Sequence, residues 1–404
     1  MHSTTLRAGL LLLALLLLPF NIEIQLAEFG GFSDLQHRVS IFLFDAPLVL
    51  LTAVSVPLLL KTRRGPLRTF LLASGALVIM TGIALAVHPS ARGFQMLLRL
   101  VVNLVVPALT WAALPREWQR VLAAAFVAAA VLQTAIGIGQ VVRGETLGLT
   151  FLGENPPLLP FGDALGAKGT FVHPYMLAGF ALIACGAAIV AYLDLRERAW
   201  LMALAVVAVP IGLTYSRMSV LAVVAITIVL VAGWFGSKRW TMPALIALLV
   251  GLGIPGLLTF DAWIGKAEPV PAETGLDAVT NFRGTFTDQA LDLISDEPLV
   301  GVGPGLYVLA LEERLEVDTE EEVFPVHNVP LLVAAEGGLP AGVLATALLA
   351  GLGLVAVRGG TGTLVLFLAY LPFLLLDHFP YDNFQGLTMT GLWTGMILGE
   401  TQHA

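Results

Sequence analysis

The chain has 404 residues, of which 57% are hydrophobic and 12% are charged, whereas about a quarter of the residues in a soluble domain are charged. This composition indicates an integral membrane protein. The formal net charge of −8 argues against nucleic acid as a partner, because phosphate backbones are bound by clustered Lys and Arg. The single cysteine, Cys185, excludes a disulfide within the chain and a thiol–metal site.

Apolar stretches recur along almost the whole sequence. The first follows Arg7 and is interpreted as a retained helix, because no small-residue cleavage pattern of a signal peptide comes after it. A helix needs roughly 20 residues to cross a hydrocarbon core of about 30 Å. By that measure the stretches predict about twelve transmembrane helices, near residues 6–20, 41–60, 68–87, 94–114, 120–141, 172–193, 199–215, 218–235, 240–260, 328–356, 362–377 and 384–399.

The predicted fold is therefore all-α and polytopic. It is expected to form one integral membrane domain, with helices one to nine in residues 1–260, a large loop at 261–326 and helices ten to twelve in residues 327–404.

Basic residues in alternate short connections predict the orientation of the chain. They occur in "KTRRGPLR" (61–68), "PREWQR" (115–120), "DLRER" (194–198), "SKR" (237–239) and at Arg358. Cytoplasmic loops carry an excess of Lys and Arg, so both termini are expected inside. The longer polar segments, at about 142–171 and 261–326, then face outward.

The larger outer loop contains a helical pattern. Its apolar residues recur at three- and four-residue spacing, at Val279, Phe282, Phe286, Ala290 and Leu293. This spacing predicts an amphipathic helix on the membrane surface. The helix is expected to stop at "SDEPLVGVGPG", where proline and glycines break helical structure. The "GVGPG" segment is interpreted as a turn rather than a phosphate cradle, because no strand or lysine accompanies it.

The stretch "FPVHNVPLLVAAEGGLPAG" (324–342) begins with a polar pair and continues as a membrane helix. Asn328 fits an N-cap and Pro330 falls in the first turn, where a missing N–H costs nothing. His327 then lies at the positive end of a helix dipole, which keeps its ring neutral and able to accept a proton. The alternative is that His327 is an interfacial histidine that only forms hydrogen bonds to a loop. The residues alone favour this alternative over a catalytic role.

Glu336 follows nine residues later, roughly 13 Å deeper along a straight helix and on its opposite side from His327. A carboxylate at that depth must be paired or protonated. A clamp to another helix is the preferred interpretation, and a proton relay is the alternative.

Four basic residues are candidates for an outer anion site: Arg217, Arg283, Lys168 and Arg99. Arginine suits phosphate because its planar fork donates two parallel hydrogen bonds. For each residue alone, a solvated or snorkelling charge is the better explanation. Only their convergence in space would favour anion binding.

Four segments taken together resemble the O-antigen ligase and polymerase superfamily of bacterial envelope glycan enzymes. They are "GTFVHPYMLAGF" (169–180), "LTYSRMSVLA" (213–222), "EPLVGVGPGLY" (297–307) and "HNVPLLVAAEGGLPAG" (327–342). Ala341 departs from the small glycine usual at that position, but alanine still allows close helix packing.

The resemblance implies a C-type, metal-independent, inverting glycosyltransferase that needs no cofactor and works at the periplasmic face of the bacterial inner membrane. The donor would be a glycan on undecaprenyl diphosphate, and the acceptor a sugar hydroxyl on lipid A core or another surface glycan. His327 would be the general base, and Arg217 and Arg283 would hold the diphosphate.

Lys168, Arg99, Asn328 and Glu336 are possible supporting residues of that site. A polymerase of the same superfamily is one alternative. A lipid-linked glycan flippase is an alternative of another class, suggested mainly by Glu336.

Overall fold

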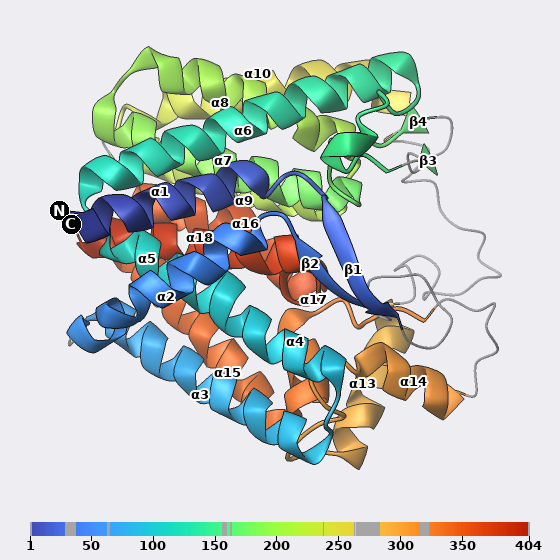
Figure 1. Cartoon of the computed structure of the whole chain (residues 1–404). Helices are drawn as coiled ribbons and strands as arrows, with labels where there is room; N and C mark the ends of the chain where they lie inside the picture. Colours follow the sequence, from blue (N-terminus) through green and yellow to red (C-terminus); the bar gives the residue numbers. More distant parts are fainter. Residues whose placement is uncertain are drawn as a thin grey trace.

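The computed structural model describes residues 2–28, 38–62, 65–155, 160–161, 164–236, 238–261, 263, 283–315 and 323–402. Figure 1 shows a bundle of helices packed side by side. The long helices are α1 (His2–Leu17), α2 (Asp45–Lys61), α3 (Pro66–Val87), α6 (Arg116–Arg143), α7 (Pro174–Leu195), α8 (Arg198–Leu213), α9 (Arg217–Phe235), α10 (Thr241–Leu258), α15 (Val329–Gly359), α16 (Thr361–Leu376) and α18 (Phe384–Gln402). One further long helical segment runs continuously through α4 (Ala91–Arg99), a π-helical stretch at Leu100–Val105 and α5 (Val106–Ala113).

Shorter elements complete the described fold. They are the helices α13 (Arg283–Asp296), α14 (Tyr307–Leu315) and α17 (Phe379–Asp382), and a 3₁₀ turn at Thr150–Leu152. Strands β1 (Glu23–Glu28) and β2 (Arg38–Phe42) pair antiparallel, as do β3 (Pro160–Phe161) and β4 (Ala164–Leu165). The chain is thus helical with two small hairpins, which the all-α prediction did not include.

Each of the twelve predicted apolar stretches overlaps a helix of the structure. Seven described helices are long and apolar enough to cross a membrane, and four others are apolar but shorter. The chain is therefore a multi-pass membrane protein, while the count of twelve crossings and the proposed domain limits remain predictions.

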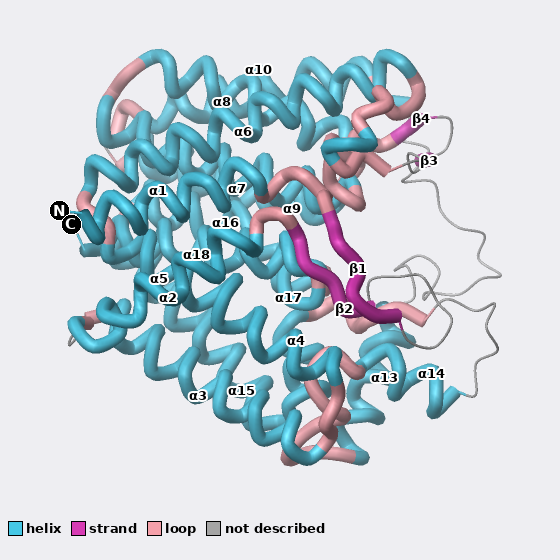
Figure 2. The backbone as a smooth tube through the Cα atoms, in the orientation of Figure 1, coloured by secondary structure: helices cyan, strands magenta, loops and turns pink. Residues whose placement is uncertain are grey.

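The two ends of the bundle differ. Both termini lie at one end, while the hairpins and the short helices α13, α14 and α17 lie toward the other end (Figures 1 and 2). This arrangement matches a chain whose termini share one side of a membrane. Parts of the predicted large loop, residues 264–282 and 316–322, are outside the described residues, and they include Val279 and Phe282 of the predicted amphipathic helix.

Helix α7 is the buried centre of the bundle. Nine of its 22 residues are Ala, Gly or Cys, and most of its side chains are buried. A Cβ atom at Gly186 would lie 2.9 Å from the Leu366 side chain, and one at Gly179 would lie 3.1 Å from the Tyr370 ring, both on α16. These glycines therefore let α7 and α16 approach closely, as small residues do between membrane helices.

Helix α15 is broken at Gly338, whose φ of 83° and ψ of 166° are not helical. The segment after Pro298 packs into the break: Leu339 N donates to Pro298 O at 2.9 Å, and Val302 N donates to Ala335 O at 2.9 Å. These bonds satisfy backbone groups that the break would leave unpaired in hydrocarbon. The "GVGPG" turn thus bonds the α15 backbone, which accounts for its glycines without a phosphate.

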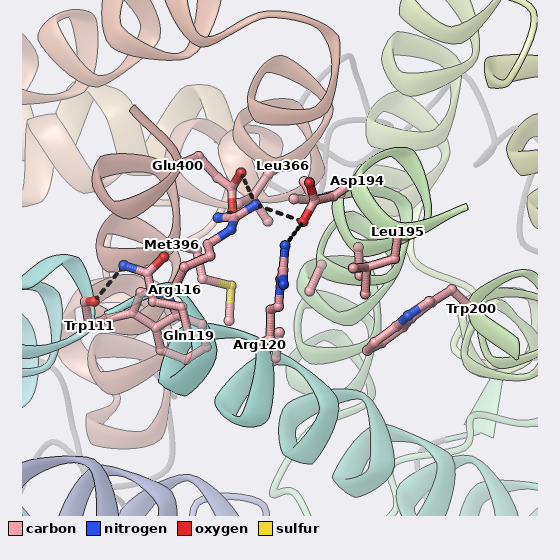
Figure 3. A pocket seen from close by; sticks show the side chains of 14 residues that line it. Trp111, Arg116, Gln119, Arg120, Asp194, Leu195, Trp200, Leu366, Met396 and Glu400 are labelled. Atoms are coloured by element: carbon pink, nitrogen blue, oxygen red, sulfur yellow. Dashed lines mark hydrogen bonds and ion pairs between the residues drawn. The ribbon is translucent and has the colours of Figure 1, made fainter. Parts of the chain in front are cut away.

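An ion network ties three helices together near the termini. Arg116 on α6 pairs with Glu400 on α18 and with Asp194 on α7, the latter at 3.4 Å, and Arg120 pairs with Asp194 at 2.7 Å. Figure 3 shows these side chains pointing toward one another. The network joins the C-terminal helix to α6 and α7.

Candidate functional site

His327 lies directly before the first turn of α15. The Asn328 side chain accepts a hydrogen bond from Leu331 N at 2.9 Å and donates one to Leu375 O at 3.1 Å. Pro330 occupies the first turn, where no backbone N–H is needed. The predicted N-cap is therefore present, and its second bond attaches this end of α15 to the end of α16.

The imidazole of His327 is held between two other rings. Phe286 on α13 stacks on it, with centroids 5.5 Å apart and planes 11° apart. His378, between α16 and α17, meets it edge-on, with centroids 5.0 Å apart. The Nδ1 atom of His327 is buried and has no hydrogen-bond partner among the described residues. Within the described chain, no hydrogen bond at Nδ1 therefore fixes the orientation of the ring.

The surroundings of His327 disfavour its charged form. Burial is the main cause, and repulsion from His378 and Arg283 adds to it, so the pKa of His327 falls to about 4. Asp377 and Asp382 act in the opposite direction but do not outweigh these effects. The ring is therefore neutral near pH 7 and holds a lone pair. The sequence predicts this neutrality from the helix dipole, whereas the structure adds burial and neighbouring cations as causes.

Arg217 is the first residue of α9, and Arg283 lies on α13. Arg283 interacts electrostatically with His327, and both arginines interact with the hydroxyl of Tyr175 in the first turn of α7. Both arginines are therefore near enough to Tyr175 for their charges to act on it, and Arg283 also acts on His327. This convergence is the condition under which the arginines favour an anion.

Arg99 belongs to a different group of contacts. It forms a buried ion pair with Asp45, donates to Ser40 O at 2.8 Å and lies over the Phe384 ring at 4.3 Å. Its charge therefore neutralises a buried carboxylate next to β2. These contacts give Arg99 a structural role, while its predicted role as support for a diphosphate remains a prediction.

Lys168 is also buried, in the segment between β4 and α7. Burial lowers the pKa of its ammonium group, while the nearby charge of Glu154 acts to raise it. Glu154 in turn accepts hydrogen bonds from Gln140 Nε2 at 2.7 Å and Leu147 N at 2.8 Å. Lys168 thus lies beside a carboxylate that orders the 145–155 loop.

Glu336 is 3% exposed and lies on the half of α15 before the break. Its carboxylate accepts a hydrogen bond from the Tyr381 hydroxyl on α17 at 3.2 Å and another from Gly305 N. Arg92 and Asp382 also interact with it electrostatically. Glu336 thus joins α15 to α17 and to the glycine turn, a contact of the clamp type that the sequence favoured.

The site contains residues to which the sequence analysis gave no role. The Asp377 carboxylate accepts hydrogen bonds from His378 N at 2.8 Å and Phe379 N at 3.3 Å. The Nδ1–H of His378 donates to Asp382 Oδ2 at 2.8 Å. The available signal was the segment "DHFPYDN", where a histidine and an aspartate lie four residues apart on an outer turn.

His378 differs from His327 in charge. Burial by itself would lower the pKa of His378, but the charge and hydrogen bond of Asp382, together with the charge of Asp377, raise that pKa to about 9. The site therefore pairs a neutral imidazole with an imidazolium near pH 7. Within the described ranges, no three His, Cys, Asp or Glu side chains are grouped so that they could hold a metal ion.

Sequence comparison connects this geometry to known proteins. Residues 199–346 match a protein family described as O-antigen ligase. The matched segment contains Arg217, Arg283, His327 and Glu336, and it ends before His378. No curated protein matches the chain.

Proposed function

From the O-antigen ligase domain at residues 199–346, which indicates activity of the ligase or polymerase type, we propose that this membrane protein transfers a glycan from undecaprenyl diphosphate. The acceptor is a sugar hydroxyl on lipid A core or another surface glycan, and the reaction takes place at the periplasmic face of the inner membrane. The observation that supports the proposal is that Arg283 interacts electrostatically with the neutral His327, and that Arg217 and Arg283 both interact with Tyr175.

The reaction requires cationic groups to stabilise the leaving diphosphate and a base to accept the proton of the acceptor hydroxyl. The acceptor oxygen forms a bond to the anomeric carbon while the bond from that carbon to the diphosphate oxygen breaks. The leaving diphosphate gains negative charge, and the guanidinium groups of Arg217 and Arg283 stabilise it. His327 Nε2 accepts the proton of the acceptor hydroxyl. The products are the extended glycan and undecaprenyl diphosphate, and the proton on His327 is later released to water.

A single displacement of this kind inverts the anomeric carbon, because the acceptor attacks from the face opposite the leaving group. The experiment is to reconstitute the purified chain in vesicles with an undecaprenyl diphosphate-linked oligosaccharide of known linkage and a lipid A core acceptor. The proposal predicts a glycosylated acceptor with inverted configuration. A retained configuration, or no transfer to any glycan acceptor, would contradict it.

Polymerisation is the closest alternative, because it uses the same chemistry with a second lipid-linked glycan as acceptor. The same vesicles distinguish the two: a ligase labels lipid A core, whereas a polymerase lengthens the lipid-linked donor. A flippase was suggested mainly by Glu336. That carboxylate is bonded to Tyr381 and Gly305, so its burial has a structural explanation that needs no transport.

A further inference from the structure

His378 is fixed more firmly than its position on a surface turn requires. Helix α17 is a single turn, Phe379–Asp382, and it places Asp382 four residues after His378. The Asp382 carboxylate bonds the His378 ring at 2.8 Å, and Asp377 bonds the backbone N of His378 at 2.8 Å. Two carboxylates therefore set both the backbone and the ring plane of this histidine.

This fixed ring contacts the candidate base. The planes of His327 and His378 stand at 89°, with centroids 5.0 Å apart. Phe286 stacks on the His327 ring. Since His327 Nδ1 has no hydrogen-bond partner among the residues described, its ring orientation rests on packing against Phe286 and His378. Where hydrogen bonds do not fix the ring of a catalytic base, packing must orient it so that its lone pair points toward the acceptor.

We propose that His378, held by Asp382, is a positioning residue for His327: it packs edge-on against that ring, fixes its plane, and places a positive charge beside it. The inference rests on the proposed function, in which His327 acts as the base. It assigns a role to a residue outside the segment that matches the family.

The charges around His327 indicate how His378 affects the protonation of the His327 ring. His378 and Arg283 on α13 repel a proton on the His327 ring, whereas Asp377 at the end of α16 and Asp382 on α17 attract one. Burial is the largest effect and also disfavours the proton. Among the charged groups, His378 contributes the largest repulsion. Removing the His378 charge therefore raises the pKa of His327.

The test uses two substitutions that remove the charge in different ways. His378→Gln retains a donor for the Asp382 carboxylate, and His378→Phe retains a flat ring against His327. The pKa of His327 is measured by NMR on the full chain with labelled histidine, and its signal is assigned with His327→Asn. The pH dependence of kcat/KM for glycan transfer is measured in parallel.

Both variants are expected to raise the pKa of His327 by roughly one unit, the size of effect that a nearby like charge produces. The acid limb of the activity profile should move up by the same amount. His378→Gln should retain more activity than His378→Phe if the hydrogen bond to Asp382 also aids positioning. An unchanged pKa of His327 in both variants would overturn the proposal, even if activity falls, because that result indicates a purely structural role.

The readouts separate this inference from the proposed function. The NMR measurement needs no transfer reaction, so failure of the wild-type chain to transfer glycan contradicts the proposed function alone. A wild-type chain that transfers glycan, with an acid limb that His378 substitutions leave in place, contradicts the positioning role alone. If either variant fails to fold, the other supplies the comparison.

Discussion

Phe286 stacks on His327, with ring centroids 5.5 Å apart and planes 11° apart. This contact joins α13, from the large polar loop, to the start of α15. Helix α13 packs against α15, and its residues Ala290, Leu293 and Ile294 are buried. The amphipathic helix predicted on the membrane surface therefore serves to cover one face of the candidate base.

Replacing Phe286 by Ala should lower kcat for glycan transfer by about tenfold, because the His327 ring is then no longer held in a fixed orientation toward the acceptor. Phe286→Tyr keeps the stacked ring and should stay within about threefold of wild type. Leu291→Ala is the matched control, since Leu291 is 50% exposed on the same helix. Equal losses in Phe286→Ala and Leu291→Ala would show that the stacking contact has no specific role.

Replacing Arg217 or Arg283 by Ala should weaken use of the lipid-linked donor, with kcat/KM for the donor falling by about 100-fold, as expected for a lost charge-assisted contact to a leaving group. Lysine should restore part of this loss, since it keeps the charge without the bidentate fork. The control is Arg143→Ala, an exposed arginine paired with its neighbour Glu145. If both alanine variants use the donor as well as this control does, the arginines do not bind the diphosphate.

The Glu336–Tyr381 contact predicts an effect on stability. Tyr381→Phe removes the donor to a buried carboxylate, which should lower the free energy of unfolding by about 1–2 kcal/mol, measured by thermal unfolding in detergent. Glu336→Ala should cost more than this, and the double variant should cost less than the sum of the two, because the residues are in contact. A Glu336→Ala chain with normal stability and no transfer would favour a proton relay instead.

The break in α15 gives a second stability prediction. Gly338→Ala combines a φ of +83° with a Cβ only 2.3 Å from Leu299 O, so the 298–303 turn would have to move off α15. We expect a loss of several kcal/mol in the free energy of unfolding, in keeping with strain and overpacking. Gly351→Ala is the control, because a Cβ there meets nothing within 4 Å. Equal stability of the two variants would contradict the packed break.

Local signals predicted much of this structure. The apolar stretches gave the helices because hydrocarbon demands continuous apolar segments, and Asn328 and Pro330 gave the start of α15 because capping depends on neighbours in sequence. The spacing of Phe286, Ala290 and Leu293 likewise gave α13. The break at Gly338 was missed because the turn that fills it lies some 40 residues earlier in the chain.

The site was predicted less completely, for the same reason. His327, Arg217 and Arg283 had sequence signals, but their neighbour Tyr175 lies on another helix. The ion pair of Arg99 had no sequence signal, because its partner, Asp45, comes from α2. His378 and Asp382 carried an i, i+4 signal, yet only the folded chain shows that their pair lies against His327.

The most direct test of the central claim is the transfer activity of His327→Ala, measured in vesicles with an undecaprenyl diphosphate-linked glycan and an acceptor at matched amounts of folded protein. Loss of a general base predicts a fall in kcat of about 100-fold or more, with the donor still bound through Arg217 and Arg283. A His327→Ala chain that transfers glycan at the wild-type rate would contradict the account.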